Sequence, residues 1–394
     1  MKTSKQTLTF NLVVQQALRP NFTPITLDAS EQALVLRYMR ARCHSINRLH
    51  TQGITIHPDV AALIPSPTKA SPKGSDQDAQ SQISIIISRK KRGSKDQRAT
   101  HKGDIAIDDF KDTPTPLVIQ GLRKYKSVAI DCEMVTVVSG SNEVAFLSAV
   151  DCLTGAILIN NYVLPSSKVL SWNTPSSGIT PSLMNRAVRS GEAILGGWAG
   201  ARQCLWDLID ADTVLVGHSI SNDLNVLGMF HSKIVDSSIL SAEAVFVPSE
   251  SNQKLTRTWS LKTLAKELLG YEIQNRRTGH SALEDAYAAR DVVIWCIQNP
   301  EEFKAWAEET HQKEMKKEEE RKLAAEKARE KREKERLQQL QKSADESASG
   351  STTPPWTSIG FDGTKEFDLV GSEATWVKVE KEKLAVFHGA GIGK

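Results

Sequence analysis

The chain lacks the marks of several large protein classes. Its five cysteines are scattered and odd in number, and none has the C-x-x-C spacing of a zinc site or favours a disulfide framework. No apolar run reaches membrane-spanning length, and Met1–Lys5 is not followed by the apolar core of a signal peptide. The net charge is only +3 in 394 residues, so bulk charge favours no class of partner. We expect a soluble intracellular protein with reduced thiols that does not enter a membrane.

The composition changes along the chain and predicts a succession of segments. Hydrophobic residues make up 40% and aromatic residues 6%, which suffices for one good core but is lean for the whole length. The predicted segments are a small helical N-terminal module at 1–63, a low-complexity basic linker at 64–116, a folded domain at 117–300, a charged helical arm at 301–345, and a linker with a short docking segment at 346–394.

The sequence of the N-terminal module predicts a capped amphipathic helix. Asp28 followed by Glu31 has the pattern of a capping box. Apolar residues then recur at helical spacing: Leu34, Leu36, Met39, Cys43, Ile46 and Leu49. The opposite side is basic and carries Arg37, Arg40, Arg42 and Arg48. This side is either a nucleic-acid-binding face or the solvated face of a docked helix.

Charged and apolar stretches outside the predicted domain leave alternatives open. The cluster Arg89–Arg92 is typical of nuclear import, and it could equally hold a phosphate backbone. It favours the nucleus, including the nucleolus, with the cytoplasm as the alternative. Ile83–Ile87 predicts a short strand or a partner-binding patch. Residues 301–345 are rich in Glu, Lys and Arg with favourable four-residue spacing, which predicts a helical spacer or an arm that binds RNA or a protein partner.

Two carboxylates follow a buried strand at the start of the predicted domain. Ser127–Ile130 is apolar and β-prone, and Asp131 and Glu133 come directly after it. Side chains alternate along a strand, so both acids point to the same face. Like charges this close raise each other's pKa or require a cation, and hard divalent metals take oxygen ligands. The alternative is a strand end at which both acids meet solvent.

Apolar patterns within residues 117–300 predict an α/β order of elements. Three strands come first and are expected to form an antiparallel meander. The later, fully apolar strand at 213–218 is typical of a central strand covered on both faces. A mixed sheet flanked by helices follows from this order. The predicted strands are 128–138, 144–150, 156–163, 213–218 and 234–236, and the predicted helices are 194–209, one beginning at 221, 261–269 and 281–298.

Further acids and a histidine are placed where they could join the strand pair. Asp223 follows the apolar strand 213–218 at a strand-to-helix switch, where open α/β sheets bind ligands. Asp285 lies in the last helix, five residues after His280, whereas Glu284 is expected to face solvent. Four carboxylates in one cleft can hold two Mg²⁺ or Mn²⁺ ions, as in two-metal phosphoryl transfer. A histidine is suited to accept a proton at neutral pH.

These residues fall in ordered motifs that resemble those of the DEDDh 3′→5′ exonucleases. The first motif has the Asp-Cys-Glu-Met form of the eukaryotic RNA exonuclease (Rex) branch. The motifs are Asp131–Met134, Val216–Leu224 and Gly279–Ala286, with supporting matches at Ser177–Thr180, Ile234–Asp236, Ser260–Ala265 and Leu269–Gln274. The resemblance covers residues 125–297 and implies a ribonuclease H-like fold, in which an antiparallel meander and parallel strands form one mixed sheet flanked by helices. The helical N-terminal module and the charged C-terminal helix are expected from the sequence pattern alone.

The resemblance also implies a role for each member of the motifs. Asp131 would bridge both metals, Glu133 and Asp285 would hold the nucleophile-side metal, and Asp223 would serve the leaving-group side. His280 would be the general base.

Substrate contacts are implied by the same motifs. Met134 resembles a position that meets the terminal nucleotide, and the neighbouring candidates are Cys132, Ser177, His218 and Asn222. His218 alone would more simply shape its loop.

The resulting functional hypothesis is a metal-dependent 3′→5′ exoribonuclease. It would hydrolyse phosphodiester bonds at single-stranded RNA 3′ ends, release nucleoside 5′-monophosphates and act in RNA processing, including that of ribosomal RNA. One alternative is a 3′→5′ DNA exonuclease, because no residue can be assigned to the 2′-hydroxyl. Another is a non-catalytic nucleic-acid-binding assembly module that works through residues 301–345.

Overall fold

The computed structural model describes most of the chain. It divides the protein into two compact units, Met1–Lys322 and Leu323–Lys394. The described residues are 23–62, 105–116, 124–246, 254–255, 257–274 and 280–349. The predicted patch Ile83–Ile87, the basic cluster Arg89–Arg92 and the C-terminal docking segment beyond 349 lie outside them.

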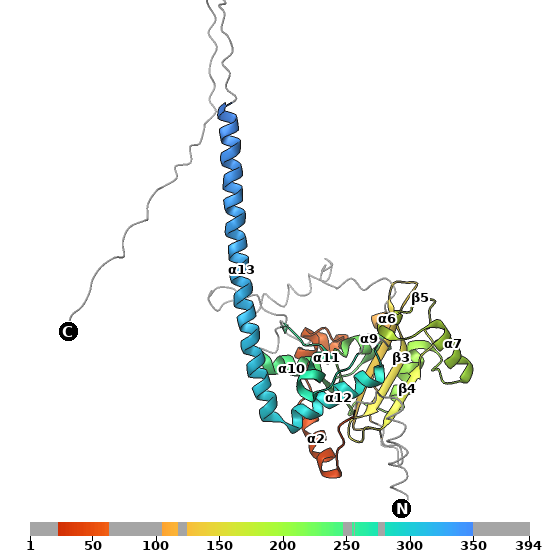
Figure 1. Ribbon diagram of the computed structural model, residues 1–394. Coiled ribbons are helices and arrows are strands. Elements are labelled where there is room, and N and C mark those ends of the chain that lie inside the picture. Colours follow the sequence, from red (N-terminus) through yellow and green to blue (C-terminus); the bar gives the residue numbers. More distant parts are fainter. Residues whose placement is uncertain are drawn as a thin grey trace, which may run out of the picture. The chain divides into compact units, whose positions relative to one another are not determined.

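A mixed sheet of six strands forms the centre of the first unit, in the order β4-β3-β2-β6-β8, with β5 paired to β2 (Figure 1). Strands β2, β3 and β4 form an antiparallel meander, whereas β6 and β8 run parallel to β2. This arrangement confirms the predicted mixed sheet. The strands are β2 (Ser127–Val137), β3 (Asn142–Asp151), β4 (Ile157–Tyr162), β5 (Val169–Ser171), β6 (Val214–Gly217) and β8 (Ile234–Asp236).

Helices pack against this sheet, and the last of them is the most buried. Helix α12 lies along β2, β3 and β6, and small alanine side chains let it approach them closely. The others include several short helices that had no clear periodicity. The helices are α6 (Thr174–Ser177), α7 (Pro181–Ser190), α8 (Gly197–Trp206), α9 (Ser221–Leu227), α10 (Ser237–Val245), α11 (Leu261–Leu264) continued by a π-helical turn η3 (Ala265–Leu269), and α12 (Ala282–Gln298).

One predicted helix is shorter than expected. The prediction began at 194, but α8 begins at Gly197. Gly196 and Gly197 both have positive φ, a conformation outside the right-handed helical region, so the backbone cannot continue as a helix through them.

The N-terminal module docks onto the same core as the sheet. Its helices are α2 (Ala29–Ala41), α3 (Ile46–Thr51) and α4 (Pro58–Ala61). The predicted capping box is confirmed, because the Asp28 carboxylate accepts from the backbone of Glu31 while the Glu31 side chain accepts from Asp28. Val35 and Met39 are buried in the core, whereas Leu34, expected on the apolar face, is 50% exposed.

Arg48 is a correction to the predicted basic face. Its side chain is buried and its Nε donates to Glu243 in α10 at 2.7 Å. The turn between α2 and α3 redirects the chain, which points Arg48 inward while Arg37, Arg40 and Arg42 remain exposed. The basic face is therefore smaller than a single continuous helix would give.

Structure begins before the end of the predicted linker. Residues 105–116 contain the 3₁₀ turn η2 (Ile107–Asp109) and strand β1 (Lys111–Asp112), which pairs in parallel with β7 (Met229–Phe230). Phe110 packs against Phe230 with ring centroids 5.2 Å apart. This apolar contact lies beside the two-stranded sheet of β1 and β7.

The predicted charged arm is the helix α13 (Pro300–Ser349). Its first turns are not solvated on all sides, because Phe303 and Ala307 are buried in the core of the first unit. The expected ion pair between Glu309 and Lys313 is present at 2.6 Å. Within the described ranges, no helix combines the length and apolar character needed to span a bilayer.

Candidate active site

The first two acids lie at the end of a parallel strand pair. Strand β2 pairs with β6 as far as Ala129 opposite Val216, so Asp131 lies level with the point where β6 gives way to α9. The backbone N–H of Cys132 donates to Asp223 Oδ1 at 2.8 Å. This hydrogen bond ties the first motif to the second, and it explains why acids about ninety residues apart in the sequence share one site.

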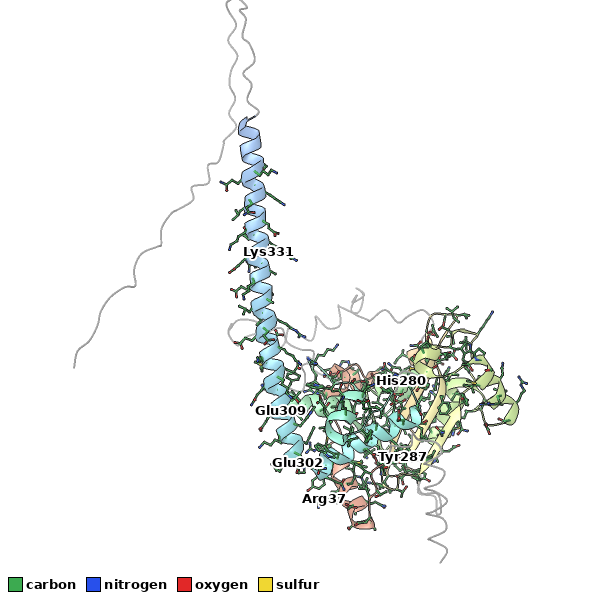
Figure 2. All side chains as sticks on the ribbon, viewed as in Figure 1. Arg37, His280, Tyr287, Glu302, Glu309 and Lys331 are labelled. Carbon is green, nitrogen blue, oxygen red and sulfur yellow. The ribbon has the colours of Figure 1, made fainter. Side chains whose placement is uncertain are left out.

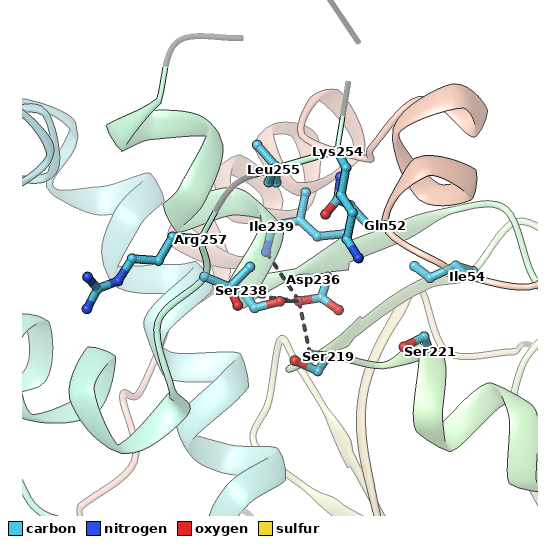
Figure 3. Close-up of a pocket in the computed structure, with 11 residues that line it drawn as sticks. Gln52, Ile54, Ser219, Ser221, Asp236, Ser238, Ile239, Lys254, Leu255 and Arg257 are labelled. Carbon is cyan, nitrogen blue, oxygen red and sulfur yellow. Dashed lines mark hydrogen bonds between the residues drawn. The ribbon is translucent and has the colours of Figure 1, made fainter. Parts of the chain in front are cut away.

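The loop before α9 is held by Asp236, which is 1% exposed. Its carboxylate accepts from the backbone of Ser219 at 3.1 Å and Ile220 at 2.8 Å, and it also caps α10 through Ser238 (Figure 3). Ile220 occupies the N-cap position of α9, and no side chain caps this helix. Gly217 allows the turn, since a Cβ there would lie 2.9 Å from the Ile220 side chain.

Asp285 and His280 come together at the start of α12, where Figure 2 labels His280. Ser281 caps the helix by accepting from the backbone of Glu284, which sets Asp285 in the first turn. The His280 backbone N–H donates to Ser176 O at 2.7 Å, so α6 anchors the histidine. His280 Nδ1 lies 3.4 Å from Asp285 Oδ2.

The electrostatics of the acids show how close they are. Burial, followed by repulsion from Asp223, Asp285 and Glu133, raises the pKa of Asp131 well above its ordinary value. Burial and the charge of Asp285 raise the pKa of Glu133 to about 8. Burial raises the pKa of Asp223 to about 7, although the hydrogen bond from Cys132 opposes this shift. Without a cation Asp131 and Glu133 favour their protonated forms at neutral pH, whereas Asp223 is close to its midpoint.

The donor set fits hard divalent cations. Glu133 Oε1 and Asp285 Oδ1 are buried oxygen atoms without a hydrogen-bond partner in the structure. Oxygen-rich sites of this kind suit Mg²⁺ and Mn²⁺. In the part of the chain that the structure describes, no three His, Cys, Asp or Glu side chains are yet grouped tightly enough to hold an ion. Asp223 turns one oxygen to Cys132 instead, and Asp285 turns one to His280.

A hollow of about 220 Å³ opens beside Glu133 and His280 and includes the predicted substrate residue Ser177. The Ser177 hydroxyl donates to Trp172 O at 2.8 Å and accepts from the backbone of Ile179. The structure therefore places Ser177 at the hollow, with its hydroxyl committed to shaping the turn.

The other predicted substrate residues occupy different environments. Met134 is partly buried after a register shift in β2 and packs on the core. Cys132 is 8% exposed, which gives its side chain a supporting position and not a surface one. His218 Nδ1 pairs with Ser237 Oγ at 2.9 Å, and burial lowers its pKa, which fits a loop-shaping residue. Asn222 is exposed.

A second hollow, of about 350 Å³, is lined in part by residues of the second motif (Figure 3). Ser219 and Ser221 line it from the α9 loop, and Gln52 lines it from the N-terminal module. Lys254 contributes an exposed cation, whereas the guanidinium of Arg257 is paired with Glu314. Residues of the N-terminal module and of the second motif therefore line one polar hollow.

Several residues of the site were missed from the sequence. Glu284, expected to face solvent, is 2% exposed, and its Oε2 accepts a hydrogen bond from the backbone N–H of Gln274. Gln274 Nε2 donates to Asp285 Oδ2 at 3.0 Å. Asp236 carried a usable signal, since an acid directly before two serines at a helix start is a typical N-cap pattern.

The fold and the site together define a class. A mixed sheet places the partly buried Asp131 and Glu133 near the buried Asp223 and Asp285, with His280 beside Asp285. Such a domain is suited to hard divalent cations and to phosphodiester chemistry.

Comparison with known proteins agrees with this class, although no protein-family model matches the chain. The chain is 30% identical to RNA exonuclease 3 of Candida albicans over 44% of this chain and 39% of that protein. It is 32% identical to small RNA degrading nuclease 2 of Arabidopsis thaliana over 45% of this chain and 36% of that protein. It is 31% identical to the human RNA exonuclease 1 homolog over 43% of this chain and 12% of that protein. The predicted resemblance to eukaryotic RNA exonucleases is confirmed.

The similarity covers only part of each relative. The chain spans at most 39% of the length of these three proteins. Among solved structures, it aligns with the Pan2 catalytic unit of Neurospora crassa at a TM-score of 0.40 and 23% identity, covering 49% of this chain and 31% of that one.

Proposed function

We propose that this protein is a metal-dependent 3′→5′ exoribonuclease that releases nucleoside 5′-monophosphates. The observation that carries the proposal is the convergence of Asp131, Glu133, Asp223 and Asp285 from one strand and two helices, with His280 beside them. The named RNA exonucleases among its relatives support RNA as the substrate.

The acids are proposed to hold two Mg²⁺ or Mn²⁺ ions. Bound ions would activate water as the nucleophile and neutralise charge on the scissile phosphate. Asp131 would serve both ions, Glu133 and Asp285 the nucleophile side, and Asp223 the leaving-group side. The partnerless oxygens of Glu133 and Asp285 support this assignment.

His280 is proposed as the general base. Its Nδ1 faces Asp285, which leaves Nε2 as the nitrogen that accepts the proton from the attacking water. The His280 side chain is 44% exposed, so the proton can pass on to solvent. Asp285 therefore has two tasks, holding a cation and orienting the base.

The 3′-terminal nucleotide is proposed to occupy the hollow beside Glu133 and His280. The turn at Ser177 and Gly178 forms one wall, and Phe146 and Tyr162 provide aromatic surface. Met134, which lies directly after the acids, would contact the same nucleotide.

The direct test uses RNA and DNA strands of one sequence, labelled at the 5′ end. Purified protein with Mg²⁺ or Mn²⁺ should shorten the RNA stepwise from its 3′ end, and chelation or Asp223→Asn should abolish shortening. Faster cleavage of the DNA strand would favour the DNA exonuclease. Binding of RNA without cleavage under either metal would favour the non-catalytic module.

Nuclear action is part of the proposal and rests on Arg89–Arg92. Replacing this cluster by alanines in the fluorescently tagged protein should move it to the cytoplasm. Unchanged nuclear fluorescence of the variant would show that the cluster is not needed for import. Cytoplasmic fluorescence of the wild type would contradict the proposed compartment.

A further inference from the structure

Gln274 lies in an unusual conformation directly above the start of α12. Its φ is +57°, and the non-glycine residues with positive φ in the described chain are Asn173, Ser219 and Gln274. The left-handed conformation is unfavourable for a residue that has a Cβ atom. Neighbouring contacts must hold it there.

Two backbone contacts do so. The Gln274 N–H donates to Glu284 Oε2 at 3.1 Å, and its carbonyl oxygen accepts from Lys262 Nζ at 3.4 Å. Ile273, which precedes it, is 1% exposed and anchors the segment in the core. The left-handed backbone thus brings the Gln274 side chain to the acids of α12.

The side chain reaches one oxygen of Asp285. Gln274 Nε2 donates to Asp285 Oδ2 at 3.0 Å, and His280 Nδ1 lies 3.4 Å from the same oxygen. Asp285 Oδ1 is buried and has no hydrogen-bond partner in the structure. The two donors occupy one oxygen and leave the other for a different ligand.

We propose that Gln274 is a positioning residue that fixes the Asp285 carboxylate so that Oδ1 faces the divalent cation of the proposed function. An amide is suited to this task because it donates a hydrogen bond without adding charge. A lysine or arginine in its place would neutralise Asp285 and compete with the cation, and a glutamate would repel the carboxylate. Outer-shell partners of this kind typically change metal affinity by about 10- to 100-fold.

The test measures Mn²⁺ binding to the full chain without RNA. Gln274→Met keeps the length of the side chain and removes the donor, and it should weaken Mn²⁺ binding by about 10- to 100-fold. Gln298→Met is the matched control, because it removes an exposed amide–carboxylate contact with Glu31 far along α12. The control should bind Mn²⁺ like the wild type.

Further variants separate positioning from support of the backbone. Gln274→Gly relieves the strain of the positive φ and removes the donor, so it should bind Mn²⁺ as weakly as Gln274→Met. In an Asp285→Asn background, Gln274→Met should have no added effect. Excess Mn²⁺ should restore RNA cleavage by Gln274→Met.

The outcomes are distinct from those of the proposed function. Unchanged Mn²⁺ affinity in a folded Gln274→Met protein would overturn the positioning role, even if its melting temperature fell. Failure of the wild type to cleave RNA while it binds Mn²⁺ in a Gln274-dependent manner would overturn the proposed function and leave the positioning role standing.

Discussion

Glu133 shows at the residue scale why the acids need a cation. Its side chain is partly buried, and among the described residues its Oε1 has no hydrogen-bond partner. Burial raises its pKa to about 8, from an ordinary value of 4.5. The folded protein therefore holds a proton on Glu133 at neutral pH that the unfolded chain releases.

This difference predicts how stability depends on pH when metal is absent. The contribution of protonated Glu133 is full below about pH 4.5 and is lost as the pH rises through about 8, a loss on the order of a few kcal/mol. The melting temperature in a chelator should fall as the pH rises through this range, and Mg²⁺ should restore it at the alkaline end.

Glu133→Gln is the control for this titration, because the amide cannot lose a proton. Its melting temperature should depend less on pH, and Mg²⁺ should stabilise it less. A wild-type melting temperature that rises with pH in the chelator would contradict the prediction.

His280 is predicted to control the acid limb of the rate profile. The hydrogen bond to Asp285 raises the pKa of His280, so the cleavage rate should rise with pH through a limb displaced upward from the usual histidine range. His280→Ala should lower kcat by about two to four orders of magnitude and remove this limb. Single-turnover cleavage across a pH series measures both effects. Near-normal rates in the variant at every pH would exclude the base assignment.

At the scale of elements, the loop between β6 and α9 is built from three parts of the chain. Asp236 at the end of β8 binds its backbone, and His44 from the N-terminal module contacts the backbone of Asp236. The hollow in Figure 3 lies against this loop and carries the exposed Lys254. Ser221, which lines this hollow, lies two residues before Asp223, so we predict that the hollow receives the part of an RNA strand upstream of its 3′ end.

Lys254→Glu should therefore weaken binding of long single-stranded RNA more than binding of dinucleotides. The binding constant falls with salt, and the loss of one phosphate contact in Lys254→Glu should make the slope of log K against log salt shallower by about 0.7. Lys304→Glu makes the same charge change on the exposed side of α13 and should leave the slope unchanged. Fluorescence anisotropy on the inactive Asp223→Asn background gives both slopes. Equal slopes for the two lysine variants would remove this hollow from the RNA path.

The described residues of the first unit form two apolar clusters, and distant segments contribute to the larger one. Val35, Met39 and Leu49 of the N-terminal module and Phe303 of α13 belong to the same buried cluster as the sheet. Burying these side chains fully stabilises the fold by about 1.5–3 kcal/mol each. Residues 23–62 thus stabilise the core on which α9 and α12 pack, although they contribute none of the four acids.

Glu243→Ala should show this dependence. It removes the ion pair of the buried Arg48 and the contact of Glu243 with His44, and it should lower the free energy of unfolding by about 3 kcal/mol. Glu308→Ala changes an exposed residue and is the control, which should alter the free energy of unfolding by less than about 0.5 kcal/mol. Denaturant titrations of both variants measure the difference. Equal midpoints would show that the module contributes little through this pair.

Much of the fold was predictable, because strong local patterns decide it. The strands of the meander and the helix that begins at Ser221 were expected within a few residues of their observed bounds. The short helices α6, α7 and α10 were not, because they depend on proline starts, caps and burial rather than on amphipathic periodicity. The inward turn of Arg48 was missed for the same kind of reason, since its partner Glu243 lies 195 residues away.

Local patterns in the amino-acid order specify the chemistry available to the protein. The alternation of Asp131 and Glu133 on one strand, and the spacing of His280 and Asp285 at a helix start, are local properties that any fold with these elements would keep. Only the tertiary structure decided which oxygens remain free and which neighbours orient them. Gln274, Asp236 and Ser176 reach the site through contacts between distant segments, and such contacts depend on packing and not on sequence spacing.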